Sequence, residues 1–204
     1  ATSANGWPSC QSELAMASIP EVIALWRQLN NIPMLAEVIG GSSQSFFVQG
    51  KLDESIRMGE ESYRLNQSIG NQYGLSITGT FLWYSYRELG HLKQAIDTAE
   101  ESIAIANEMK FFGPQWGALV ELGATFDWLG DYARATEYAQ RALANIMPNT
   151  PTHPIFPNAV LAMVALHHGR HTKAKEFLES FSIDSLELLF QINPIGAVHS
   201  FATF

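Results

Sequence analysis

Apolar residues recur every three or four positions along most of the chain, which is the spacing of one face of an α-helix. Before Gly130, this pattern is followed by Leu119, Leu122, Phe126 and Leu129. The pattern stops at the glycine, which suits the left-handed turn that ends many helices, and resumes a few residues later. The sequence therefore predicts pairs of helices joined at a glycine.

The same arrangement occurs four times along the chain. Four blocks align with one another: FFVQGKLDES at 46–55, YRELGHLKQA at 86–95, FDWLGDYARA at 126–135 and ALHHGRHTKA at 165–174. Their glycines are 40, 40 and 39 residues apart, at Gly50, Gly90, Gly130 and Gly169. A fixed period of this length is the signature of a repeat protein.

Each block predicts a helical hairpin whose two helices cross closely. The second helices are expected to start at Asp53, Lys93, Asp131 and Thr172. Five residues after each glycine stands a small side chain: Ser55, Ala95, Ala135 or Ala174. A larger residue at such a crossing would force the helices apart at a cost of about 1–3 kcal/mol. Because one hairpin cannot bury its apolar face alone, the predicted fold is all-α, a solenoid of antiparallel helix pairs.

The two ends are expected to differ from the repeats. Residues 1–17 are predicted to be poorly ordered or part of a cap, and 183–204 to form a C-terminal capping helix and tail. Ser18 and Glu21 have capping-box spacing, with Pro20 in the first turn of a helix that would run from about Ile19 to Asn30. At the other end, a short helix is expected from Asp184 to Pro194. The solenoid between them covers 18–182, with a half repeat at 18–35 and repeats near 36–75, 76–115, 116–154 and 155–182.

The repeats resemble the tetratricopeptide repeat over roughly 36–182. The residues that carry the resemblance are Leu122, Gly123, Phe126, Gly130, Tyr132, Ala135 and Ala142, with Pro148 after the second helix. The period of about 40 exceeds the ~34 residues of the common motif. Trp83 stands where the family usually has glycine or alanine, and it is expected to distort one packing contact. The longer period, with linkers such as IGNQYGLS, is similar to the sensor repeats of STAND-type regulatory ATPases and to the repeat tails of adenylate cyclases and transcription activators.

The resemblance implies a right-handed superhelix whose first helices line a concave groove. Carried over position by position, the ligand-binding residues are Gln44, Phe47, Tyr84, Arg87, Asp127, Trp128, Met163 and His167. Aromatic rings would supply flat apolar area, while charged groups would orient a polar ligand. The alternative is that curvature of the superhelix buries some of these side chains against neighbouring repeats.

Charge and composition narrow the class of partner. The formal net charge is −8 and the sequence pI is near 5.2, so the chain repels phosphate backbones and nucleic acid is not expected as a partner. The longest aliphatic run, at 159–166, is far too short to cross a bilayer, and no membrane contact is expected. The opening residues lack the basic and apolar parts of a signal peptide, which predicts a cytoplasmic location.

Catalytic and metal sites are not expected, and neither is a cofactor. His167 and His171 are four apart, as in helical zinc pairs, but Gly169 between them would end the helix. Ser43, Ser55, Ser62 and Ser102 occupy small packing positions, and the paired glutamates at 60–61 and 100–101 are interpreted as a solvated convex face. An Asp127–His167 pair across the groove is interpreted as part of a binding site and not of an enzyme.

Two functions from different classes remain open. The first is a binding module, the sensor or regulatory part of a larger signalling or transcription-regulatory protein. Its partner would be a protein or peptide, with a small-molecule effector as the other choice. The second is a structural scaffold or self-association spacer with nothing in the groove, and apolar solenoid ends are compatible with a homodimer.

Overall fold

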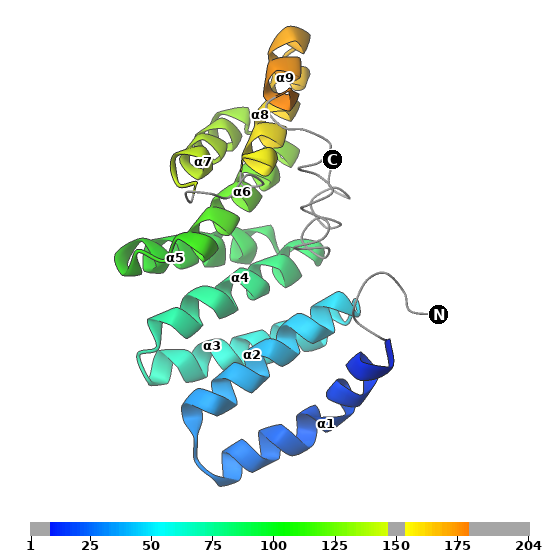
Figure 1. Ribbon diagram of the computed structural model, residues 1–204, viewed down its shortest axis with the longest axis vertical. Coiled ribbons are helices and arrows are strands. Elements are labelled where there is room, and N and C mark those ends of the chain that lie inside the picture. The colour runs from blue at the N-terminus through cyan, green and yellow to red at the C-terminus, as the bar shows by residue number, and fades with distance from the viewer. Residues whose placement is uncertain (1–8, 147–153, 180–204) are drawn as a thin grey trace. The chain divides into compact units, whose positions relative to one another are not determined.

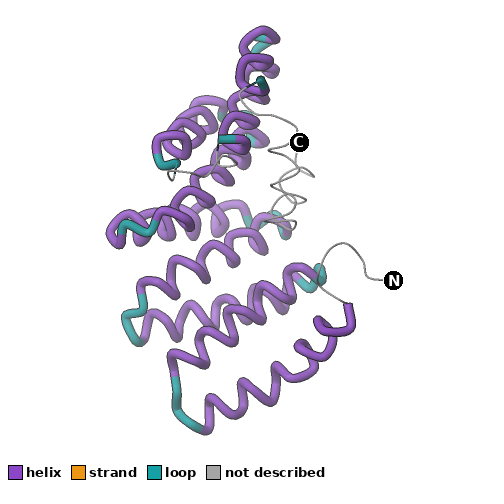
Figure 2. The backbone as a smooth tube through the Cα atoms, viewed as in Figure 1, coloured by secondary structure: helices purple, strands orange, loops and turns teal. Residues whose placement is uncertain are grey.

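The computed structural model describes residues 9–146 and 154–179. Within these ranges the fold is all-α, with helices joined by short turns (Figures 1 and 2). The helices are α1 (Ser9–Gln28), α2 (Ile32–Val48), α3 (Leu52–Ser68), α4 (Gln72–Glu88), α5 (Leu92–Met109), α6 (Phe112–Trp128), α7 (Tyr132–Ala144), α8 (Ile155–His167) and α9 (His171–Leu178). Of these helices, none combines the length and apolar character that crossing a bilayer requires.

The helices form hairpins within two compact units, and the division falls between Lys110 and Phe111. In the first unit, α1 packs on α2, α2 on α3, α3 on α4 and α4 on α5, and α2 also contacts α4. In the second unit, α6–α9 pack in the same way, and α6 also contacts α8. The first helices of successive hairpins therefore touch one another inside each unit. This is the repeat-like packing that the 40-residue period predicts.

The turns inside the hairpins are as the sequence predicts. Gly50, Gly90, Gly130 and Gly169 all have positive φ, between 67° and 76°, which is the left-handed conformation that glycine adopts without strain. The second helices start within one residue of the predicted positions.

A second series of left-handed residues lies between the hairpins. These residues are Asn30, Gly70 and Lys110, again 40 apart, with φ of 50°, 65° and 55°. After the first two of them, an asparagine caps the next helix: Asn31 accepts from the Met34 amide at 3.2 Å, and Asn71 accepts from the Gly74 amide at 3.1 Å. Phe111 occupies the third cap position and makes no side-chain cap bond.

The predicted helix crossings are confirmed. Ser55, Ala95, Ala135 and Ala174 are at most 2% exposed. In the first unit hydroxyls join the crossings: Ser43 and Ser55 each donate to the other's carbonyl at 2.8 Å, and the Ser55 and Ser85 hydroxyls lie 2.8 Å apart. Ser43, Ser55 and Ser85 are thus hydrogen-bonded structural groups.

Trp83 fills its crossing position without being expelled from the core. Its side chain is 2% exposed, and its indole Nε1 has no hydrogen-bond partner in the described part of the chain. The guanidinium of Arg87 lies 4.6 Å from the ring. Burial of this tryptophan therefore leaves one polar group, the indole N–H, without a hydrogen bond within the described residues.

The start of α1 differs from the prediction. The helix begins at Ser9, so Ser18 lies inside it and does not cap it, and Pro20 is an interior proline. The run Glu-Leu-Ala-Met-Ala at 13–17 consists of strong helix formers, which continue the helix past the apparent cap. The expected helix from Asp184 to Pro194 and the segment 147–153 lie outside the described residues.

Candidate functional site

The predicted site residues share one register on the first helices. Phe47, Arg87, Asp127 and His167 follow one another at intervals of 40 residues, each in the last turn of its helix. The two members in each unit come from helices that contact each other, α2 with α4 and α6 with α8. The repeat therefore brings side chains of different chemistry to equivalent places.

In the first unit the shared surface is aromatic. The rings of Phe47 on α2 and Tyr84 on α4 lie 5.7 Å apart, tilted by 39°, and both side chains are half-buried. Tyr84 also meets Trp83 edge-on, with 4.5 Å between the ring centroids. Gln44, one turn before Phe47 on α2, is half-buried too. These residues offer apolar area with an amide beside it.

Arg87 is buried, in contrast to the open groove position predicted for it. Its side chain is only 2% exposed, and Nη2 donates to Glu88 Oε1 at 2.9 Å. Its guanidinium carbon lies over two rings, 4.6 Å from Trp83 and 5.8 Å from Tyr84. Arg87 is thus buried, as the packing alternative expects, but the aromatic rings beside its charge belong to its own helix α4 and not to a neighbouring repeat.

In the second unit, Asp127 and His167 are brought together. His167 Nδ1 lies 3.1 Å from Asp127 Oδ1, so the ionised carboxylate accepts a hydrogen bond from the ring. Asp127 is 4% exposed, whereas the imidazole is 38% exposed. Burial raises the pKa of Asp127, and the charge and hydrogen bond of His167 partly offset this effect. The ring of Tyr132 on α7 lies 5.0 Å from that of His167.

This pair can orient an imidazole. With Nδ1 held by Asp127, the ring's Nε2 is left to interact with another molecule. Among the residues that the structure describes, no hydroxyl or thiol is hydrogen-bonded to His167. The arrangement is therefore that of a positioned hydrogen-bonding group, without the nucleophile that a catalytic triad needs.

The other predicted residues of the second unit are more accessible. Trp128, next to Asp127 at the end of α6, is 54% exposed, and Met163, one turn before His167 on α8, is half-buried. His167 and His171 lie on different helices, as expected, because α8 ends at His167 and α9 begins at His171. Within the described ranges, no group of three or more potential ligands is placed to hold a metal ion.

Two tyrosine–glutamate pairs were not predicted. Tyr86 donates to Glu60 at 2.8 Å, and Tyr63 is hydrogen-bonded to Glu101. Burial, together with the adjacent carboxylate, raises the pKa of both phenols above the ordinary range. Glu101 is exposed and the side chain of Glu60 is 44% exposed, so both remain accessible to solvent while each accepts a hydrogen bond from a tyrosine of another helix. The sequence carries no local pattern for these pairs, because Tyr63 and Tyr86 come close to the glutamates only when the hairpins pack together.

The raised pKa of Asp127 gives an expected pH dependence. The folded state holds a proton on this carboxyl at pH values where the unfolded chain, with a carboxyl pKa of about 3.9, has released it. Wild-type stability therefore falls as pH rises through the interval between the two pKa values. In Asp127→Asn this loss is absent, so the stability of the variant relative to wild type should increase as pH rises above about 4.

Urea unfolding followed by circular dichroism at several pH values measures this difference. Asp97→Asn is the matched control, because Asp97 is an exposed carboxylate paired with Lys93. A relative stability of Asp127→Asn that stays flat or decreases with pH would contradict the expectation.

Comparison with known proteins supplies a fold and no family. No family model and no curated protein matches the sequence. Among solved structures, the fold is similar to that of BtubC (BKLC) from P. vanneervenii, with a TM-score of 0.76 and 15% identity over 90% of this chain and 75% of that one. At this identity the likeness concerns the fold alone.

Proposed function

We propose that this chain is a non-enzymatic binding module of the tetratricopeptide type, a right-handed α-solenoid that recognises a protein or peptide through the ends of its first helices. The observation that carries the proposal is Trp128, which is 54% exposed at the end of α6. Trp128 directly follows Asp127, which occupies the same repeat position as His167. The module would serve as the sensor or regulatory part of a larger signalling or transcription-regulatory protein.

The side chains around these positions have the character of a recognition surface. Exposed and half-exposed aromatic rings contribute large contact areas at low entropic cost, and tryptophan and tyrosine are frequent binding hot spots. Phe47 and Tyr84 supply such area in the first unit, and Trp128 supplies it in the second. His167, oriented by Asp127, adds a directed polar group in the second unit. A spacer would need none of these side chains.

Selection from a phage-displayed library of random peptides tests the proposal. Peptides selected on the unaltered chain should lose affinity for Trp128→Ala by about tenfold or more, since truncating a hot-spot aromatic costs about 2 kcal/mol. Phe112→Ala is the matched control, because Phe112 is 48% exposed at the other end of the same helix. Isothermal titration calorimetry measures the affinities, and circular dichroism verifies that both variants are helical.

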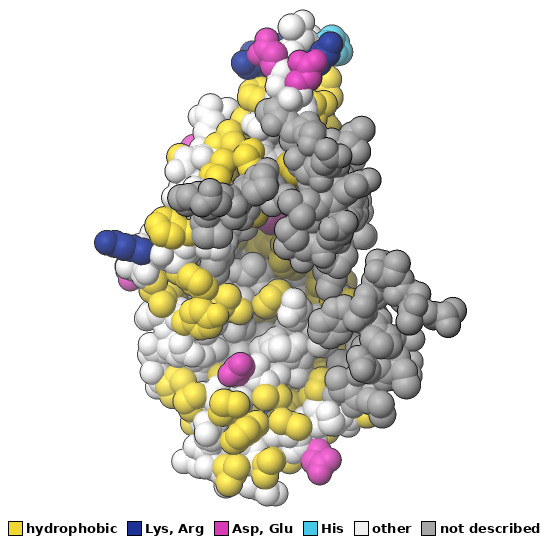
Figure 3. Space-filling model, in the orientation of Figure 1, with side chains coloured by type: hydrophobic (Ala, Val, Ile, Leu, Met, Phe, Trp, Pro, Cys, Tyr) yellow, Lys and Arg dark blue, Asp and Glu magenta, His cyan; other side chains and the backbone are white. Residues whose placement is uncertain are grey.

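One observation favours self-association as a second function. Hydrophobic side chains gather over α1 and α2 in the lower part of Figure 3. In these helices and the turn between them, Leu25 is 48%, Leu29 60% and Met34 36% exposed. If the selected peptides bind Trp128→Ala and Phe112→Ala equally, and sedimentation shows a mass that rises with concentration, the scaffold function replaces the binding module.

A further inference from the structure

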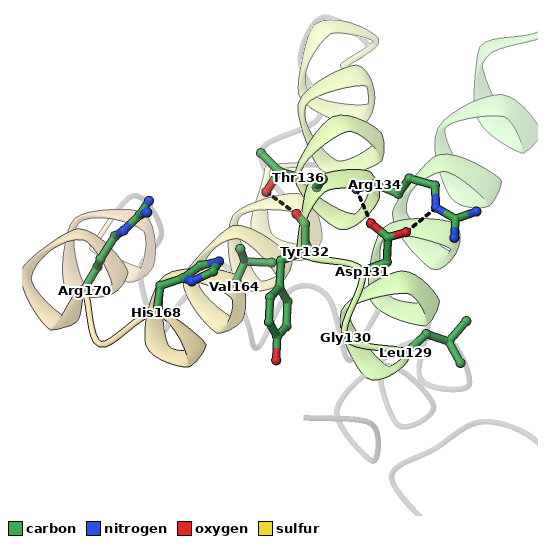
Figure 4. Close-up of a pocket in the computed structure, with 10 residues that line it drawn as sticks. Leu129, Gly130, Asp131, Tyr132, Arg134, Thr136, Val164, His168 and Arg170 are labelled. Atoms are coloured by element: carbon green, nitrogen blue, oxygen red, sulfur yellow. Dashed lines mark hydrogen bonds and ion pairs between the residues drawn. The ribbon is translucent and has the colours of Figure 1, made fainter.

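The second unit contains a depression that is separate from the predicted groove residues. Its volume is about 790 Å³, and it is bounded by the turn between α6 and α7, the first turns of α7 and the turn between α8 and α9 (Figure 4). Leu129, Ala133 and Val164 contribute apolar atoms to its lining. Its polar lining comes from these two turns and from the first turns of α7. Side chains at such positions can reach a partner that approaches the ends of the helices.

Arg170 lies at one side of this depression. It is exposed, and its guanidinium has no hydrogen bond or carboxylate partner within the described residues. The lysines that follow on α9 differ in this respect, since Lys173 pairs with Glu176 at 2.9 Å and Lys175 with Glu179 at 3.4 Å. The charge of Arg170 is thus uncompensated in a chain whose net charge is −8.

Arg134 lies at the opposite side and is fixed in position. Its Nε donates to Asp131 Oδ2 at 2.6 Å, and its guanidinium carbon lies 4.0 Å from the centre of the Phe126 ring. Hydrogen bonds from Arg134 to Asp131 lower the pKa of that carboxyl, so it stays ionised and holds the arginine. The terminal nitrogens of Arg134 make no hydrogen bond within the described residues, and they remain as donors.

Between the two arginines lies an aromatic group. The centroid of the Tyr132 ring lies 5.0 Å from that of His167 and 5.0 Å from that of His168. Figure 4 shows Tyr132, His168 and Val164 between Arg170 and Arg134. The depression thus has the exposed cation of Arg170 at one side, the Arg134–Asp131 ion pair at the other, and an aromatic and apolar centre.

We propose that this depression binds a short acidic segment of a partner protein. Carboxylates of the segment would meet Arg170 and Arg134, since guanidinium groups form charge-assisted, frequently bidentate hydrogen bonds with carboxylates. An aliphatic side chain between the carboxylates would contact Leu129 and Val164. A nucleic acid fits less well, because the two arginines of the lining would neutralise only a small part of its continuous phosphate charge. This inference does not rest on the proposed function, because neither arginine belongs to the predicted groove residues.

Fluorescence anisotropy with a fluorescein-labelled peptide Glu-Glu-Leu-Leu-Glu-Glu tests the inference on the full chain. We expect saturable binding that weakens as salt is added and that falls by about tenfold or more in Arg170→Glu, where attraction becomes repulsion. Arg57→Glu makes the same change of charge at an exposed arginine on α3, and it should alter the affinity by less than about twofold. Circular dichroism checks that both exposed substitutions leave the helices intact.

Three outcomes would overturn the inference: no saturable binding, an equal loss in Arg170→Glu and Arg57→Glu, or tighter binding of a labelled single-stranded oligonucleotide. Trp128→Ala separates this site from the proposed function. That variant should bind the acidic peptide as the unaltered chain does, even though it loses the peptides selected from the library.

Discussion

Replacing Phe126 with alanine should lower the free energy of unfolding by about 3–5 kcal/mol. The ring is fully buried at the end of α6, stacked on Tyr138 with 5.4 Å between centroids and covered by the guanidinium of Arg134. Its removal leaves a cavity between α6 and α7 and takes away the surface on which Arg134 lies. Urea unfolding followed by circular dichroism and tryptophan fluorescence measures the loss.

Phe112→Ala is the control for this experiment as well. Phe112 lies on the same helix but is 48% exposed, so its truncation should change stability by no more than about 0.5 kcal/mol. If both substitutions lowered the free energy of unfolding equally, the buried contact between α6 and α7 would not be the cause of the loss, and the prediction would be wrong.

Two glycine-to-alanine substitutions should have effects of opposite sign. A Cβ atom on Gly59 of α3 would lie 2.7 Å from Leu82 Cδ2, 2.8 Å from Leu82 Cγ and 3.0 Å from the Ser43 hydroxyl. Neither neighbour can move away, because both are buried in the crossings of α2 and α4. Gly59→Ala should therefore destabilise the fold by about 1–3 kcal/mol. Gly41→Ala in α2 meets nothing within 4 Å, and it should stabilise the helix by about 0.5–1 kcal/mol.

A double-mutant cycle identifies the cause of the first effect. When Leu82→Ala makes room, Gly59→Ala should cost less than it does in the wild-type background, since the two substitutions share one contact. Additive losses, or a destabilising Gly41→Ala, would mean that the glycines act through the backbone and not through helix separation.

The hairpins could be predicted from the sequence because their requirements are local. A left-handed turn needs a residue such as Gly90, and a close crossing needs one such as Ala95, whatever the rest of the chain does. The start of α1 could not be predicted in this way. The capping-box spacing of Ser18 and Glu21 competes with the helix propensity of the residues before it, and the propensity prevails.

The contacts of the candidate site could be predicted from the sequence only in part. The register that places Arg87 and Asp127 on first helices does not reveal that the arginine lies over Trp83 and Tyr84 of its own helix, or that His167, one repeat away, meets the carboxylate. The Asp127–His167 pair could be named beforehand as one arrangement among several. Only the packing of α6 on α8 selects it. The tyrosine–glutamate pairs arise in the same manner, from contacts between helices that no local pattern records.

The left-handed residues between the hairpins also bear on how such a chain changes its length. Gly70, just before the stretch Asn71–Lys110, and Lys110, its last residue, give the backbone the same left-handed conformation, although one is a glycine and the other is not. A tandem duplication of that stretch would join Lys110 to a new Asn71, and this joint would pair a left-handed residue with an asparagine cap, as Gly70 and Asn71 already do. Insertion of a whole hairpin at this point would therefore keep the backbone conformation that connects one hairpin to the next.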